Sequence, residues 1–158
     1  MLKKTFSLRL FSWLLAGLLL LTGGQASLLF SKSVSALALA EDDIEVEEDG
    51  TYTSKEEVAA YIHEFGHLPG NYISKSKARK EGWVPSKGNL HKVCPGKSIG
   101  GSEFYNDEGQ LPDARGRTWK ECDINYTGGH RGAERIVFSN DGLVFYTPDH
   151  YRTFEQLY

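Results

Sequence analysis

The sequence is poor in features that identify several other classes of protein. Only two of its 158 residues are cysteines, so at most one disulfide can form within the chain. No internal repeat is present. The longest apolar stretch is broken at Gly23 and Gly24 and is too short to span a bilayer comfortably. These absences argue against a disulfide-dense scaffold, a repeat protein and an integral membrane protein.

The main part of the chain also lacks a net charge. Four of the 18 Lys and Arg residues lie in residues 1–40, and seven of the 21 Asp and Glu residues lie in residues 41–50. Residues 51–158 therefore hold 14 residues of each sign. A protein that coats nucleic acid is normally basic, so this balance argues against one. A neutral domain can still bind one or two phosphates locally.

The first forty residues have a composition of their own. A basic start at Lys3, Lys4 and Arg9 precedes the apolar stretch 10–21, and small residues follow at Ala38-Leu39-Ala40. This order is typical of a secretory signal peptide, with a membrane anchor as the alternative. We therefore predict that residues 1–40 are a signal peptide and that the protein is secreted and extracellular, with no stable membrane association after processing.

Residues 41–50 form an acidic segment, which we expect to be a disordered, solvated leader because like charges at this density repel. Residues 51–158 then form the single folded domain. An exported chain meets an oxidising environment, so a disulfide between Cys94 and Cys122 is predicted, with two buried free thiols as the alternative.

The domain changes character near its middle. Ser54 and Ser74 are N-cap residues for two helices that end at Gly66 and Gly82, and a third short helix is expected from about Ser86 to Lys92. Strand patterns follow at 99–104, 117–126, 135–139 and 143–147, the last two joined by an Asn-Asp-Gly turn. Helices followed by strands predict an α+β fold, with N-terminal helices packed on a C-terminal antiparallel sheet.

One short motif points to a different chemistry. His63-Glu64-Phe65-Gly66-His67 matches H-E-x-x-H, in which two histidines one helical turn apart bind zinc. Gly66 lies inside the motif and Pro69 follows, so the helix is expected to end before His67 and to separate the two rings. A zinc metalloprotease is therefore kept only as an alternative function, and no metal or other cofactor is predicted.

Cleavage of RNA by internal transesterification needs a base for the 2′-hydroxyl, an acid for the leaving 5′-oxygen and cations for the phosphoryl charge. It needs no metal, because the nucleophile belongs to the substrate. Glu121 shares one face of its strand with Trp119 and Asp123, and Arg131, Arg135 and His150 follow later in the chain. These residue types match the three roles, but they are not specific on their own.

Several segments resemble those of the barnase-type secreted microbial guanyl-preferring ribonuclease family. The resemblance covers about residues 53–157 and rests on the segments 71–76, 82–84, 86–90, 95–101, 116–119, 123–127 and 149–151. It implies the microbial ribonuclease fold, in which the concave face of the sheet carries the site. It also implies a small acidic, barstar-like inhibitor protein inside the producing cell. The protein itself is expected to be a monomer.

The resemblance assigns roles to individual residues. Glu121 matches the general base and His150 the general acid, while Lys75, Arg131 and Arg135 match the basic groups around the scissile phosphate. The segment 104–108 matches the guanine-binding loop. The residues expected to bind substrate are Phe104, Tyr105, Asn106, Glu108 and Tyr151. Asp123 is expected to orient the arginines. The predicted activity is an endoribonuclease that cuts single-stranded RNA after guanosine through a 2′,3′-cyclic phosphate.

The sequence departs from the family pattern at four positions. Asp107 replaces an arginine and Tyr105 replaces a serine in the base-binding loop, while Cys94 and Cys122 replace alanines. The loss of a positive charge at Asp107 is expected to weaken the grip on substrate and on an acidic inhibitor. A non-catalytic RNA-binding module on the same fold stays open as a further alternative.

Overall fold

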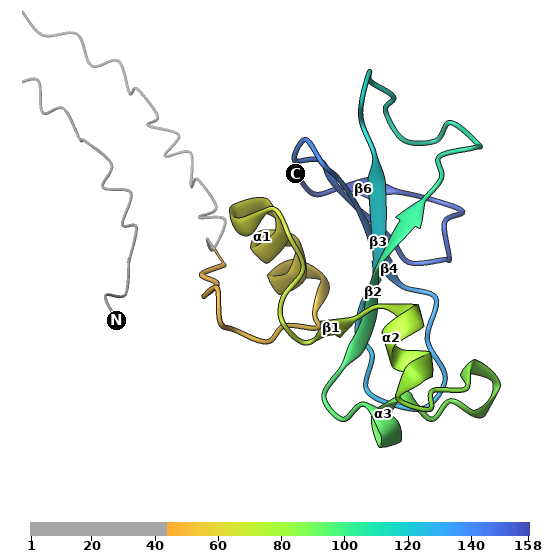
Figure 1. Cartoon of the computed structure of the whole chain (residues 1–158). Helices are drawn as coiled ribbons and strands as arrows, with labels where there is room; N and C mark the ends of the chain where they lie inside the picture. Colours follow the sequence, from red (N-terminus) through yellow and green to blue (C-terminus); the bar gives the residue numbers. More distant parts are fainter. Residues whose placement is uncertain (1–43) are drawn as a thin grey trace, which may run out of the picture. The chain divides into compact units, whose positions relative to one another are not determined.

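Helices precede the main sheet along the chain, as Figure 1 shows for residues 44–158, which this computed structural model describes. The helical elements are α1 (Lys55–Phe65), α2 (Lys75–Lys80), the 3-10 turn η1 (Pro85–Lys87) and α3 (Leu90–Val93). The strands are β1 (Tyr72–Ile73), β2 (Ser98–Phe104), β3 (Trp119–Asp123), β4 (Arg135–Ser139), β5 (Val144–Thr147) and β6 (Glu155–Gln156). The predicted signal peptide lies outside the described residues.

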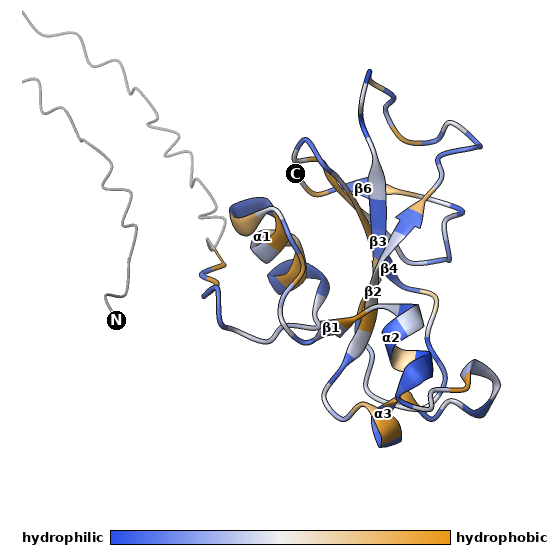
Figure 2. Ribbon diagram, in the orientation of Figure 1, coloured by the Kyte–Doolittle hydropathy of each residue, from blue (hydrophilic) through white to orange (hydrophobic). Residues whose placement is uncertain are grey.

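The first helix begins and ends as its sequence predicts. The hydroxyl of Ser54 accepts a hydrogen bond from the backbone N–H of Glu57 at 3.3 Å and donates to its carboxylate at 2.6 Å. Gly66 ends the helix in the left-handed conformation, with φ at 72°. Val58, Ala59 and Ile62 are buried, and Figure 2 shows hydrophobic as well as hydrophilic residues along α1. The apolar side of α1 thus packs on the sheet.

The expected third helix is interrupted. η1 ends at Gly88, whose φ of 55° is left-handed, and α3 then starts at Leu90. A side chain is excluded at this glycine, because a Cβ there would lie 2.8 Å from the carbonyl carbon of Gly129. Close backbone packing therefore divides this segment into two short turns, in place of one helix from Ser86 to Lys92.

The strands form one sheet in the order β1-β2-β3-β4-β5-β6. The neighbours from β2 to β6 are antiparallel, which confirms the predicted α+β fold. β1 adds a two-residue parallel pairing with β2 that the sequence did not predict. In the β3–β4 ladder Asp123 lies opposite Arg135, and Glu121 lies opposite Val137. This register places a carboxylate and a guanidinium side by side on one face.

The two faces of the central strands differ. One face packs Cys122, Ile124, Ile136 and Phe138 against α1. The other carries a second apolar cluster of Leu111, Trp119, Val137 and Phe145, together with the buried polar residues Glu121, Asp123 and Arg135. Alternation along each strand produces this division. A third cluster joins β1, α2, α3 and the start of β2.

The predicted disulfide is wrong, because both cysteines are free and buried. Cys122 packs beneath α1, whereas Cys94 packs in the separate cluster with Trp83 and Leu90. Burial raises the pKa of the Cys122 thiol, and the nearby carboxylate of Asp123 adds to that effect. Each cysteine thus acts as a small apolar core residue.

The acidic segment is described from residue 44 onward. The backbone N–H of Glu47 donates to the hydroxyl of Tyr52 at 2.8 Å, and the hydroxyl of Tyr61 donates to the carbonyl of Glu48 at 2.8 Å. A turn closes from Gly50 to Glu47. These contacts connect residues 47–50 to Tyr52 and Tyr61, while the side chains of Glu47, Glu48 and Asp49 stay exposed to solvent. Across residues 44–158 no helix combines the length and apolarity that a membrane span requires.

Candidate active site

The centre of the site lies on β3, where strand alternation brings two acids to the face opposite α1. Glu121 is 6% exposed and Asp123 is 2% exposed. A bulge between Gly100 and Ser102 in the neighbouring strand shifts the register, so that Ser102 lies opposite Glu121. Two buried carboxylates two residues apart need cationic or hydrogen-bonding partners.

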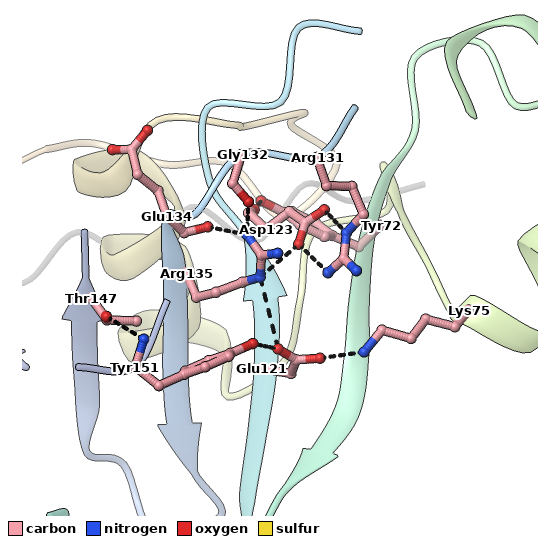
Figure 3. Close-up of polar contacts among 10 residues, drawn as sticks. All are labelled: Tyr72, Lys75, Glu121, Asp123, Arg131, Gly132, Glu134, Arg135, Thr147 and Tyr151. Carbon is pink, nitrogen blue, oxygen red and sulfur yellow. Dashed lines mark hydrogen bonds and ion pairs between the residues drawn. The ribbon is translucent and has the colours of Figure 1, made fainter. Parts of the chain in front are cut away.

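Glu121 has three such partners, drawn in Figure 3. Lys75, from the start of α2, places Nζ 2.6 Å from Oε1. Tyr151 donates its hydroxyl to Oε2, and Arg135 places Nε 3.8 Å from the same oxygen. The carboxylate is therefore held between α2, β4 and the turn after β5, and cations reach both of its oxygens.

Asp123 holds the two arginines together. Arg131 binds it through a fork, with Nε 2.6 Å from Oδ2 and Nη2 2.5 Å from Oδ1. The Nε of Arg135 lies 3.0 Å from Oδ1, and its Nη1 donates to the carbonyls of Gly132 and Glu134 at 2.8 and 2.7 Å. Asp123 thus orients both arginines, as the sequence predicted.

The environment acts differently on the two guanidinium groups. Burial opposes the charge on Arg131, but the hydrogen bonds and charge of Asp123 outweigh it and raise the pKa of Arg131. Burial lowers the pKa of Arg135, and the neighbouring Arg131 acts in the same direction. Arg135 is thus the more desolvated cation and lies between Glu121 and Asp123 (Figure 3).

His150 and Tyr151 lie in a strained turn after β5. Both have left-handed backbones, with φ of 58° and 73°. Asp149 supports the turn, because its carboxylate accepts from the backbone N–H groups of Arg152 and Thr153 at 3.1 and 2.9 Å. These bonds lower the pKa of Asp149, and the bond from the backbone N–H of Thr153 has the largest effect. Sequence reasoning assigned no role to Asp149, although an acid after a proline is a typical turn former.

An open pocket of about 430 Å³ joins the turn to the arginines. It is lined by Pro85, His130, Arg131, Gly132, Ala133, Arg135 and His150. Three of the five residues predicted as catalytic therefore line one pocket, and the other two, Glu121 and Lys75, pair with each other beside it. His130 was not predicted as a site residue.

The predicted base-binding loop lies next to this group. The ring of Phe104 is 5.2 Å from that of Tyr151, which links the loop to the turn that contains His150. The side chain of Asn106 closes the loop, since its amide donates to the carbonyl of Leu111 at 2.8 Å and accepts from its N–H at 3.0 Å. These two bonds fix the side chain of Asn106 against Leu111 and leave its backbone groups free of this pairing.

The exposed side of the loop carries polar groups. Tyr105 is 71% exposed and donates its hydroxyl to Glu103 at 2.8 Å, while Glu108 accepts from Gln110 at 2.5 Å. Residues 103–107 line a second pocket of about 290 Å³ with Asp113, Arg117, Thr118 and Trp119. Glu108 is exposed to solvent and does not line that pocket.

The H-E-x-x-H motif does not form a zinc site. α1 ends at Phe65, so His67 lies beyond the helix and contacts the carbonyl of Leu68 through Nδ1. The ring of His63 instead stacks on Tyr158 at 4.1 Å. Within residues 44–158 no group of three His, Cys, Asp or Glu residues is placed to hold a metal ion. The helix end separates the two rings, as the glycine predicted.

Comparison with known proteins agrees with this geometry. A family model described as ribonuclease matches residues 38–158. The chain is 57% identical over 100 residues to a ribonuclease of Heyndrickxia coagulans, a match that spans 63% of this chain and 92% of that protein. It is equally identical over 100 residues to a ribonuclease of Bacillus intermedius, but spans only 62% of that protein's length. A guanyl-specific ribonuclease of Saccharopolyspora erythraea is 42% identical over 55 residues, covering 34% of this chain and 54% of that protein.

The family match covers more than half of the chain, and the fold and the acidic and basic residues on the open face of the sheet agree with it. The chain therefore belongs to the barnase-type family of microbial ribonucleases.

Proposed function

We propose that the protein is an endoribonuclease that cleaves single-stranded RNA after guanosine by transesterification, without a metal ion. The observation that carries this proposal is the pairing of Glu121 with Lys75 and Arg135 beside the pocket that contains His150. A buried carboxylate, a histidine and several cations are the groups that the reaction requires.

In the first step Glu121 takes the proton from the 2′-hydroxyl, and the 2′-oxygen forms a bond to phosphorus. The bond from phosphorus to the 5′-oxygen breaks, and His150 donates a proton to that oxygen. The charge on the phosphoryl oxygens is stabilised by Arg131, Arg135 and Lys75. A planar guanidinium group suits this role, because it can donate two parallel hydrogen bonds to phosphate oxygens. The products are a 2′,3′-cyclic phosphate and a free 5′-hydroxyl.

In the second step the roles reverse. His150 takes a proton from water, the water oxygen attacks phosphorus, and Glu121 returns a proton to the 2′-oxygen as its bond to phosphorus breaks. A 3′-phosphate results. Histidine suits this exchange, because it changes its protonation state near neutral pH.

The preference for guanosine is proposed from the loop 104–108. The side chain of Asn106 is hydrogen-bonded to Leu111, so the backbone N–H groups of the loop are available to a base. The exposed carboxylate of Glu108 can accept from the guanine N1 and N2 donors. The exposed ring of Tyr105 is available for stacking. The guanyl-specific relative supports the same assignment.

We further propose that the protein is exported through its N-terminal apolar segment, acts as a monomer, and is held inactive before export by a small acidic inhibitor protein. The cationic pocket supports the inhibitor proposal, because an acidic surface would complement Arg131 and Arg135.

The activity test is cleavage of a short RNA that contains one guanosine, in the presence of EDTA. The unchanged protein is expected to cut after the guanosine. Glu121→Gln and His150→Gln are each expected to lower kcat by about 100-fold or more. Glu64→Ala, in the zinc-like motif, is the matched control and should cut at the normal rate. Binding without cleavage by the unchanged protein would instead favour a non-catalytic RNA-binding module, and cleavage that EDTA abolishes would contradict a reaction without a metal ion.

A further inference from the structure

A histidine outside the catalytic group contacts the loop that carries Arg131. The ring of His91, in α3, accepts a hydrogen bond at Nδ1 from the backbone N–H of Gly129 at 3.1 Å. Gly129 lies two residues before Arg131, in the loop 124–134 between β3 and β4. A ring nitrogen that accepts a hydrogen bond carries no proton, so this contact requires the neutral imidazole with its proton on Nε2.

The peptide of Gly129 is fixed from two other directions. The hydroxyl of Tyr126 donates to the carbonyl of Gly129 at 3.1 Å. The backbone at Gly88 packs so closely that a Cβ there would lie 2.8 Å from the carbonyl carbon of Gly129. Burial raises the pKa of Tyr126, while the backbone N–H of His91 beside its hydroxyl opposes that rise. The segment from η1 to α3 therefore acts as a support for this loop.

The loop needs such a support because of its composition. Gly128 and Gly129 have φ of 121° and 71°, and Gly132 follows Arg131. Glycine loses more conformational freedom on ordering than any other residue, so contacts from outside must hold this loop. Beyond the glycines, His130 and Arg131 enter the pocket that also contains Arg135 and His150. The position of Gly129 thus bears directly on the cationic pocket.

We propose that neutral His91 is a positioning residue that holds the loop 124–134 in place, and that its protonation in acid releases Gly129 and weakens the grip on the RNA phosphate. The effect on RNA rests on the proposed function, whereas the release of Gly129 does not. A doubly protonated imidazole has no nitrogen lone pair left to accept a hydrogen bond, so the contact with Gly129 is lost once His91 is protonated.

The segments that meet at this contact carry several charged or titratable groups. They are Lys92 on α3, Lys87 on η1, Tyr126, His130, Arg131 and Glu134 on the loop, and Asp123 at the end of β3. Asp123 is already paired with Arg131 and Arg135, and Glu134 accepts from Tyr146 at 2.6 Å. The carboxylates of Asp123 and Glu134 therefore already have partners other than His91.

The first test follows the backbone amide of Gly129 by NMR between about pH 5 and pH 8, the range in which histidine titrates. In the unchanged protein its resonance is expected to move in step with the His91 ring. In His91→Asn, whose side-chain oxygen can accept at every pH, that movement should disappear. His63→Asn, in α1, is the matched control and should leave it intact. The proposal would be overturned if, in the unchanged protein, the amide resonance of Gly129 did not move together with the resonances of the His91 ring.

The second test measures kcat and KM for a short RNA with one guanosine. Between about pH 7.5 and pH 5, the KM of the unchanged protein should rise about threefold to tenfold more than that of His91→Asn, the effect of losing one hydrogen bond. The ratio of their kcat values should stay constant. His130 and His150 are the same in both proteins, so any effect of theirs cancels in the comparison. An equal rise in KM for the unchanged protein and for His91→Asn would count against the proposal. If the unchanged protein cut no RNA, the proposed function would be refuted. The NMR experiment would still decide the role of His91.

Discussion

Lys75, the first residue of α2, donates to Glu121, in the middle of β3, at 2.6 Å, although 46 positions separate them in the chain. The glutamate side chain is 8% exposed and the lysine side chain 33%. The contact therefore joins a half-buried cation to a buried carboxylate and connects the helical half of the domain to strand β3.

Replacement of Lys75 by Met is expected to lower kcat for RNA by about 10- to 100-fold, because one cation near the phosphoryl oxygens is lost. It is also expected to lower the free energy of unfolding by about 1–3 kcal/mol, since Glu121 keeps only Arg135 and Tyr151 as partners. Steady-state kinetics and urea unfolding measure the two effects. Lys77→Met, at an exposed position of the same helix, should change neither. Equal activities of the two variants would contradict this role of Lys75.

Gly88→Ala is expected to destabilise the protein by about 2–4 kcal/mol, because a Cβ at this position would lie 2.8 Å from backbone of the loop and the φ of 55° disfavours a side chain. The matched control is Gly96→Ala, where φ is 71° but nothing lies within 4 Å, and which should cost only about 1 kcal/mol. Denaturant unfolding compares the two. Equal losses would show that backbone strain alone, and not the close packing on Gly129, decides the effect.

Asp141 is expected to stabilise the fold only above acidic pH. Arg117 donates to its carboxylate through Nε and Nη2, at 2.9 and 2.7 Å, and lowers the pKa of Asp141 to about 2. Since the folded pKa lies below the ordinary value of 3.8, the stabilisation is complete above that value and is lost as the pH falls towards 2.

Thermal unfolding of Asp141→Asn tests this expectation. Its Tm should be lower than that of the unchanged protein at neutral pH, and the two curves should converge as the pH falls below about 4. A difference in Tm that persists unchanged in acid would show that the aspartate acts through its shape rather than its charge.

The two thiols are expected to resist modification in the folded protein. Both are buried, and burial raises the pKa of Cys122, which reduces its reactive thiolate form. Mass spectrometry after alkylation should find few labels on the native protein, but two labels on protein unfolded without reductant. Tm should be the same with and without reductant. A protein that takes up labels after unfolding only when reductant is present would instead contain the disulfide.

The helix ends and strand faces could be predicted because they depend on local chemistry. Ser54 and Ser74 cap their helices, Gly66 ends the first one, and alternation along 119–123 places Glu121 and Asp123 on one face. Local sequence patterns predicted the secondary structure less well where segments distant in the chain pack against an element. The third helix divides at Gly88 because a distant loop packs there, and β1 forms only because β2 lies beside it.

The same distinction between local chemistry and contacts of distant segments applies to the candidate site. Residue types and their spacing pointed to an acid, a base and cations, and the family resemblance named the positions. The support of the His150 turn by Asp149 and of Gly129 by His91 could not be read from spacing, since each depends on how the loops lie in space. The cysteines show the limit most clearly, because composition favoured a disulfide that their separate apolar clusters do not form.

The sequence by itself determined the order of helices and strands, the faces of the central strands and the residue types available for catalysis, because capping, alternation and charge are properties of neighbouring residues. Only the tertiary structure decided which charges meet. Lys75 reaches Glu121, Arg131 forks onto Asp123, and Arg135 lies between the two acids. Such pairings depend on strand register and on the packing of elements far apart in the chain, and both arise only when the whole sheet is assembled.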